Sequence, residues 1–143
     1  MTIPLKKLNQ NDFAKYGRIL DFNSEDQDLF QVVVLESGGY GWRIAMMKVV
    51  NQPIAKVACH PNTMESFEPV SGICGILVGS YDKPSELEAF ILNRAVCIDK
   101  SVWHAVFSLS GQAIVRVTEN AEVHSETIEL SDKLCIGLTG CKG

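Results

Sequence analysis

The chain has 143 residues, of which 46% are hydrophobic, and this favours one folded domain spanning 1–143 over two. Seventeen acidic residues against thirteen basic ones give a net charge of -4, which argues against a protein that binds the phosphate backbone of a nucleic acid. No stretch has the layout of a signal peptide or the roughly 18 uncharged apolar residues of a membrane span. We therefore expect a soluble, cytoplasmic protein that binds no membrane.

The first quarter of the chain predicts short elements separated by turns. Residues 5–8 are expected to form a strand, and residues 12–16 a helix of about one turn that Gly17 ends. Residues 18–21 are expected to be extended, and residues 23–28, rich in turn formers, form a predicted loop. The chain therefore begins with a strand and one brief helix.

The remainder predicts strands. The β-branched run 29–36 and the run 42–50 flank a glycine-rich turn at 37–41, which together predict a hairpin. Eight further short apolar runs follow between turn signals: 55–59, 64–70, 72–79, 87–92, 96–98, 106–109, 113–118 and 126–130. Runs this short and evenly spaced indicate an all-β sandwich or barrel. The glycine-rich tail 137–143 is expected to fray.

The five cysteines predict a reduced protein. They are odd in number, contain no Cys-x-x-Cys pair and stand mostly among apolar neighbours, at positions 59, 74, 97, 135 and 141. We interpret them as buried thiols of a reducing compartment. Cys59 differs from the others because it precedes His60 directly.

Three side chains suggest a metal site. His60, Glu65 and His104 supply two imidazoles and a carboxylate, the set with which zinc, manganese, iron or nickel can bind while keeping positions for substrate. Strand alternation and a turn after His60 allow all three to face one pocket. The alternative is that the histidines are hydrogen-bonded structural residues and Glu65 a surface carboxylate. His124, in an alternating polar segment, is predicted to be structural or exposed.

The spacing around His60 resembles a known signature. Four residues separate His60 from Glu65, and six separate Glu65 from Gly72, as in the first motif of the cupin superfamily, where Ala58 would be another histidine. The second cupin motif keeps His104 but lacks its glycines and proline. The resemblance implies an all-β, cupin-like double-stranded β-helix, or jelly-roll barrel, with the short N-terminal helix added. It also implies a homodimer, since related barrels pair through an edge sheet.

A narrower resemblance is to the ureidoglycolate lyase family of cupins, which splits ureidoglycolate into glyoxylate and urea in allantoin and purine breakdown. The matching segments are 8–13, Tyr16-Gly17, His60-Pro61 with Phe67, 82–84, Ala89-Phe90, Asn93 and 102–104. This resemblance implies a lyase acting on a small polar carboxylate metabolite. It implies His60, Glu65 and His104 as catalytic residues and Lys83, Asn93 and Trp103 as substrate-binding residues.

The chain departs from that family in ways that keep other functions open. Ala58, Cys59 and Ala105 stand where the family has glutamate, arginine and histidine, so the arginine that could hold a substrate carboxylate is missing. Lys83 is the first candidate to replace it, ahead of Arg94 and Lys100. The alternatives are a non-catalytic cupin that binds a small metabolite, and a metal-dependent cupin isomerase or dioxygenase.

Overall fold

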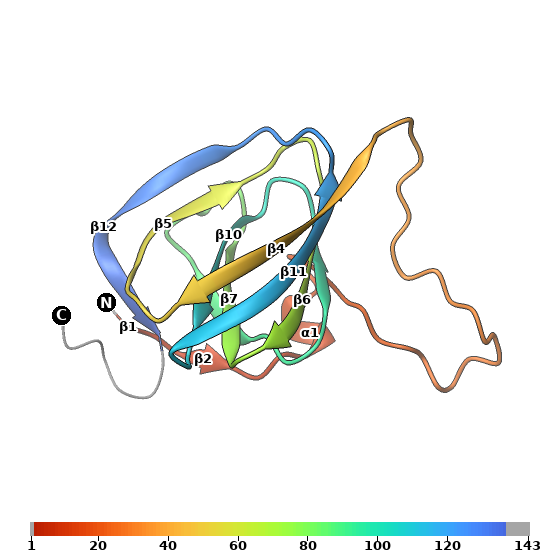
Figure 1. The fold of residues 1–143 in the computed structure, drawn as a ribbon, viewed down its shortest axis with the longest axis horizontal. Coiled ribbons are helices and arrows are strands. Elements are labelled where there is room, and N and C mark those ends of the chain that lie inside the picture. Colours follow the sequence, from red (N-terminus) through yellow and green to blue (C-terminus); the bar gives the residue numbers. More distant parts are fainter. Residues whose placement is uncertain (1, 137–143) are drawn as a thin grey trace.

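In the computed structural model, which describes residues 2–136, the chain forms two β-sheets and one short helix (Figure 1). The elements in chain order are β1 (Thr2–Ile3), β2 (Leu5–Lys6), α1 (Gln10–Phe13), β3 (Gly17–Ile19), β4 (Trp42–Val50), β5 (Ile54–Cys59), β6 (Glu65–Ser71), β7 (Cys74–Gly79), β8 (Glu88–Ile91), β9 (Val96–Ile98), β10 (Trp103–Ser108), β11 (Gln112–Asn120) and β12 (Glu126–Ile136). Within this range no helix is long and apolar enough to cross a membrane. The tail 137–143 lies outside the described residues.

The strand order identifies a jelly roll. The seven-stranded sheet has the order β1-β12-β5-β10-β7-β8-β2, and the five-stranded sheet has the order β3-β9-β6-β11-β4. Successive strands from β4 to β7, and again from β9 to β12, alternate between the two sheets, so the chain winds around a common core. The pairs β1–β12 and β2–β8 are parallel, and the other pairs are antiparallel. The predicted all-β jelly-roll barrel is confirmed.

Side-chain alternation places the main core between the sheets. On β11, Ala113, Val115 and Val117 are buried in this core, while the residues between them are partly exposed. A second apolar cluster occupies the other face of the seven-stranded sheet and includes Trp103 and Phe107. Strand β7 is buried along its whole length because both of its faces are covered.

The helix begins earlier than its sequence pattern predicts. The Asn9 side chain accepts a hydrogen bond from the Asp12 amide at 2.9 Å and so caps the helix three residues before the predicted start. Phe13 at its end packs edge-on against Phe90, with ring centroids 5.4 Å apart. The predicted short N-terminal helix is therefore confirmed, with its bounds shifted. Most predicted strands match within a few residues, although β10 begins at Trp103 and β12 continues beyond residue 130.

The hairpin predicted for 29–36 and 42–50 is wrong in its first half. Residues 20–41 contain no strand, and the segment extends away from the barrel as a long arm before β4 begins (Figure 1). Within the arm, Gln31 exchanges hydrogen bonds with the backbone of Asn23, which closes the tip into a loop. A β-branched run forms a strand only where a neighbouring strand accepts its backbone hydrogen bonds, and this segment has no such neighbour here.

Candidate metal centre

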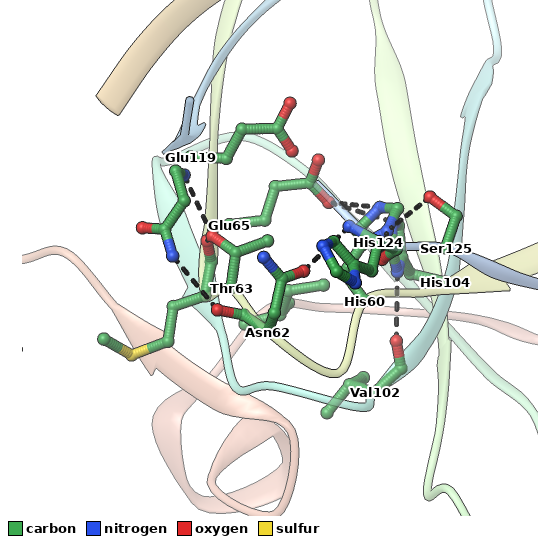
Figure 2. A network of polar contacts seen from close by, with 12 residues as sticks. His60, Asn62, Thr63, Glu65, Val102, His104, Glu119, His124 and Ser125 are labelled. Atoms are coloured by element: carbon green, nitrogen blue, oxygen red, sulfur yellow. Dashed lines mark hydrogen bonds and ion pairs between the residues drawn. The ribbon is translucent and has the colours of Figure 1, made fainter. Parts of the chain in front are cut away.

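His60, Glu65 and His104 converge at one end of the barrel from both sheets (Figure 2). His60 follows β5 directly, and His104 is the second residue of β10, where it lies opposite Ala58 of β5. Glu65 begins β6 in the facing sheet. The jelly-roll connection between β5 and β6 thus brings His60 and Glu65 from different sheets to one point.

The three ligand atoms lie close together. Glu65 Oε1 is 2.9 Å from His104 Nε2 and 3.6 Å from His60 Nε2, and all three atoms fall within 4.8 Å of one another. The side chains are largely shielded from water, with 13% of His60, 8% of Glu65 and 9% of His104 exposed. The predicted grouping of these three residues is therefore what the structure contains.

Hydrogen bonds fix both imidazole rings. His104 Nδ1 lies 3.0 Å from the Val102 carbonyl, and His60 Nδ1 lies 3.2 Å from the His124 carbonyl and 3.0 Å from Ser125 Oγ (Figure 2). A carbonyl can only accept, so each Nδ1 donates its proton, and a neutral ring then turns the lone pair of Nε2 toward Glu65. Hydrogen-bonded Nδ1 atoms orient metal-binding histidines in the same way.

The loop that carries His60 is tied to the loop before β12. Asn62 accepts a hydrogen bond from the His124 amide at 2.8 Å and donates one to the Glu122 carbonyl at 2.8 Å. Thr63 Oγ1 accepts from the Asn120 amide at 2.9 Å. These bonds hold the turn between β5 and β6 in place, so the separation of His60 from Glu65 is preorganised.

Burial acts differently on the two kinds of group. Burial lowers the pKa of His60, which keeps this imidazole neutral, the form that binds metals. For Glu65, burial alone would raise the pKa, but the contacts with His104 and Glu119 and the nearby imidazole of His60 outweigh burial and lower it. The Glu65 carboxyl group therefore favours its ionised form, and His60 favours the neutral form that can offer a lone pair to a metal.

The donor set fits a divalent cation. Glu65 Oε1 is buried and forms no well-directed hydrogen bond, although His104 Nε2 is near it. Ligand atoms on a shared ion, each bonded at about 2.0 to 2.2 Å, stand roughly 3.0 to 3.6 Å apart, close to the 2.9 and 3.6 Å that separate Glu65 Oε1 from the two Nε2 atoms. When both rings are neutral at Nε2, their lone pairs and the Glu65 carboxylate repel one another, and a metal ion between them would supply the compensating positive charge.

Two further residues of the site, Glu119 and Arg43, were not predicted from the sequence. Glu119 of β11 pairs in register with Glu65, and Arg43 of β4 pairs in register with Glu119. Arg43 Nε and Nη2 donate to Glu119 Oε2 at 2.9 and 2.7 Å, while the buried Glu119 Oε1 has no partner. Burial and the contact with Glu65 raise the pKa of Glu119 to about 7. The available signal was a glutamate that continues the inward-facing series 113, 115 and 117.

The predicted substrate-binding residues lie apart from this centre. Lys83 lines another surface hollow with Lys15 and Glu88, and its Nζ is 3.9 Å from Glu86. Asn93 borders a hollow at the far end of β6 from Glu65. Trp103 faces away from His104, since adjacent strand residues point to opposite faces, and its indole donates to the Tyr81 carbonyl at 3.0 Å. Their binding role stays a prediction.

The remaining residues singled out from the sequence are two basic residues, three of the cysteines and His124. Arg94 pairs with Asp21, and Lys100 pairs with Glu36 at 2.9 Å. Cys59 is fully buried, and burial, followed by the Glu126 contact, raises the pKa of its thiol to about 12, so it stays protonated. Cys74 and Cys97 are buried free thiols. His124 is exposed and serves the centre only through its backbone.

Comparison with protein-family models and with curated proteins gave no match. Among solved structures, a dTDP sugar isomerase from Desulfovibrio desulfuricans G20 is similar over 78% of this chain and 80% of its own, with a TM-score of 0.53 and 15% identity. A TDP-quinovose 3,4-ketoisomerase from Campylobacter jejuni matches over 56% of this chain and 62% of its own (TM-score 0.46, 22% identity). Bacillus subtilis oxalate decarboxylase matches over 64% of this chain and 24% of its own, with a TM-score of 0.48 and 18% identity.

This chain thus spans less than two thirds of the ketoisomerase and about a quarter of the oxalate decarboxylase. At these identities, the likeness concerns the fold. Together with the strand order described above, the likeness to the Desulfovibrio isomerase shows that the chain has a jelly-roll fold.

Proposed function

We propose that this protein is a metal-dependent enzyme in which His60, Glu65 and His104 hold one divalent cation and the substrate is a small, polar, anionic metabolite. The observation that carries the proposal is the orientation of the three groups. Both Nδ1 atoms are held by carbonyl oxygens, and both Nε2 atoms face a buried carboxylate oxygen that lacks a well-directed hydrogen bond. Zinc, manganese, iron and nickel all accept such a set. When bound, the cation would polarise a substrate oxygen.

Glu119 and Arg43 supply the groups that such a reaction needs beside the centre. The two bonds from Arg43 fix Glu119 by one oxygen and leave Oε1 free next to Glu65. A carboxyl group in that position can take a proton from the substrate or return one to it. Half of the Arg43 side chain is exposed, at 51%, so its guanidinium can also attract an anionic substrate.

The specific candidate within this class is the lyase reaction on ureidoglycolate. Elimination of urea needs a base for the hydroxyl proton, an acid for the leaving nitrogen and a cation for the substrate carboxylate. Arg43 favours this candidate because it provides a guanidinium next to the centre. It would replace the arginine of the ureidoglycolate lyase family, whose position is occupied by Cys59 in this chain. In this proposal Arg43 takes the carboxylate-binding role that the sequence suggested for Lys83.

The competing function within the fold is isomerisation of a dTDP sugar, the activity named for the Desulfovibrio protein. It would use the same centre for proton transfer next to a polarised carbonyl. A cupin that only binds a metabolite is the third possibility, and it needs a ligand but no proton carrier. The unpartnered oxygen of Glu119 favours the two enzymatic functions over simple binding.

The test combines metal analysis with turnover. Protein purified without added metal should contain about one equivalent of a transition metal, which His60→Ala and His104→Ala lose and His124→Ala, the exposed control, retains. Metal-loaded protein should then release glyoxylate from ureidoglycolate, and a dTDP sugar serves as the second substrate. Absence of metal from the purified and the reloaded protein would contradict the proposed class. Bound metal without glyoxylate release would contradict the lyase.

A further inference from the structure

Exposed apolar side chains are concentrated in one part of the molecule. Of the thirteen large apolar side chains exposed within residues 2–136, ten lie between Phe22 and Val50: Phe22, Leu29, Phe30, Val32, Leu35, Tyr40, Trp42, Ile44, Met46 and Val50. Leu29 and Phe30 at the arm tip are 93% and 88% exposed. Large apolar patches on a soluble protein mark interaction surfaces. The arm (residues 22–41) and the outer face of β4 are therefore one candidate interface.

One edge of strand β4 is open for pairing with another strand. It stands at the edge of the five-stranded sheet, pairs with β11 along all nine of its residues, and has no strand on its other side within residues 2–136. Its outward side chains Trp42, Ile44 and Met46 are 71%, 56% and 57% exposed, so the edge is apolar as well as open. A long, apolar edge strand of this kind invites pairing with a further chain.

Part of the arm has the composition and length of a strand that could pair with this open edge. Residues 29–36 have the β-branched composition of a strand and nearly the length of β4, yet within residues 2–136 they form no strand pairing. The base of the arm is tied to the barrel, because Lys100 pairs with Glu36 at 2.9 Å and lies over the Tyr40 ring. Figure 1 shows the arm directed away from the body of the molecule.

Charge and area both point to a second copy of this chain. The arm carries four acidic residues, of which Glu36 is paired with Lys100, and no basic one. Strand β4 carries no acidic residue, and of its two cations Arg43 is paired with Glu119 while Lys48 has no ion-pair partner among the described residues, so an arm from one molecule suits β4 of another. The ten side chains expose on the order of 1,000 Å² per molecule, against roughly 800 Å² per partner in a stable interface. Two reciprocal arm-to-β4 contacts close under a two-fold axis, which gives a dimer.

We propose that two copies of this chain form a dimer in which residues 29–36 of each pack along β4 of the other. The proposal gives the homodimer expected from the sequence a defined surface, and it does not depend on the proposed enzymatic function. It also explains why residues 29–36 have a strand-forming sequence without a strand in a single chain.

A complementation experiment tests it. Sedimentation or light scattering should give twice the chain mass of 15.7 kDa for the unmodified protein. The arm variant Phe30→Asp with Leu35→Asp, and the β4 variant Ile44→Asp with Met46→Asp, should each give the mass of one chain. The control Ile73→Asp, at a residue 56% exposed outside the patch, should keep the double mass. Circular dichroism must show the same β content in all variants.

The mixture of the two variants decides the arrangement. Each mixed pair contains one arm-to-β4 contact with both partners unmodified, so the mixture should recover the double mass, whereas contacts of arm with arm or of β4 with β4 would stay broken. A single-chain mass for the unmodified protein would overturn the proposal. Folded variants that remain dimeric, or a mixture that fails to recover, would also overturn it.

Discussion

Two glutamates of this barrel show how the same side chain can stabilise a fold or prepare a site. Glu88 of β8 accepts a hydrogen bond from the Tyr16 hydroxyl and is paired with Lys6 Nζ at 2.6 Å and Lys15 Nζ at 3.2 Å. Burial alone would raise the pKa of Glu88, but the bonds from Lys6, Tyr16 and Lys15 outweigh it and lower the pKa to about 2. Its charge is fully compensated within the chain.

Glu65 has no lysine or arginine partner among the described residues, and only its contacts with two histidines and Glu119 lower its pKa. Its neighbours are two imidazoles whose Nδ1 protons are already committed and a second carboxyl group, Glu119, whose own cation Arg43 lies on the far side. One oxygen of each of these carboxyl groups is buried without a hydrogen bond. Buried polar groups are normally satisfied, so an exception that lies among potential metal ligands indicates a place for something the chain itself does not supply.

The largest effect that separates the two regions is expected from Glu65→Gln. Removal of the charged ligand should weaken binding of zinc or manganese by more than about 100-fold, measured by isothermal titration calorimetry of chelator-treated protein. The free energy of unfolding of the metal-free variant should lie within about 1 kcal/mol of that of the unmodified protein, because one oxygen of Glu65 has no hydrogen bond in the unmodified protein. Glu68→Gln, on the exposed side of β6, is the control. Unchanged affinity would refute the distinction between the two glutamates.

Glu88→Gln should have the opposite pattern. Since the folded pKa of about 2 lies below the ordinary value of 4.5, the ionised group stabilises the fold above about pH 4.5, and this contribution is lost as the pH falls toward 2. At pH 7 the variant should lose about 2 kcal/mol of unfolding free energy, with screening by water taken into account, and it should bind metal normally. Urea titrations at pH 7 and pH 3 measure this, with Glu86→Gln as the exposed control. A difference that grew at acid pH would contradict the assignment.

The substitution Glu119→Gln tests the role of the second carboxyl group in the metal centre. Glu119 lies opposite Glu65 on the neighbouring strand and contacts its carboxylate. We expect metal affinity to fall about tenfold, as is usual for a partner of a ligand, and turnover to fall further if Glu119 carries the proton. Calorimetry and steady-state kinetics separate the two effects, and Glu122→Gln is the exposed control. Loss of affinity without loss of turnover would argue against the proton-carrying role.

The smallest effect is expected from Ser125→Ala. This change removes one partner of His60 Nδ1 but leaves the His124 carbonyl in place, so the ring should keep its orientation. Metal affinity should decrease by less than about tenfold. A loss as large as that of Glu65→Gln would show that Ser125, and not the carbonyl, fixes the imidazole.

The fold could be predicted from the sequence because short apolar runs and turn residues are local signals. The grouping of His60, Glu65 and His104 followed from motif spacing, which encodes the way β5, β6 and β10 meet. Glu119 and Arg43 could not be found in this way, because their positions depend on the register of β4, β11 and β6. The error at 29–36 has a different cause: composition describes what a segment can pair with, and no strand within residues 2–136 pairs with this one.

The most direct test of the metal centre is anomalous diffraction from crystals soaked in manganese. We expect one strong peak per chain within about 2.0 to 2.3 Å of His60 Nε2, His104 Nε2 and a carboxylate oxygen of Glu65, and no peak at Glu88. Manganese bound elsewhere, or an absence of density between these three residues at millimolar manganese, would contradict the account.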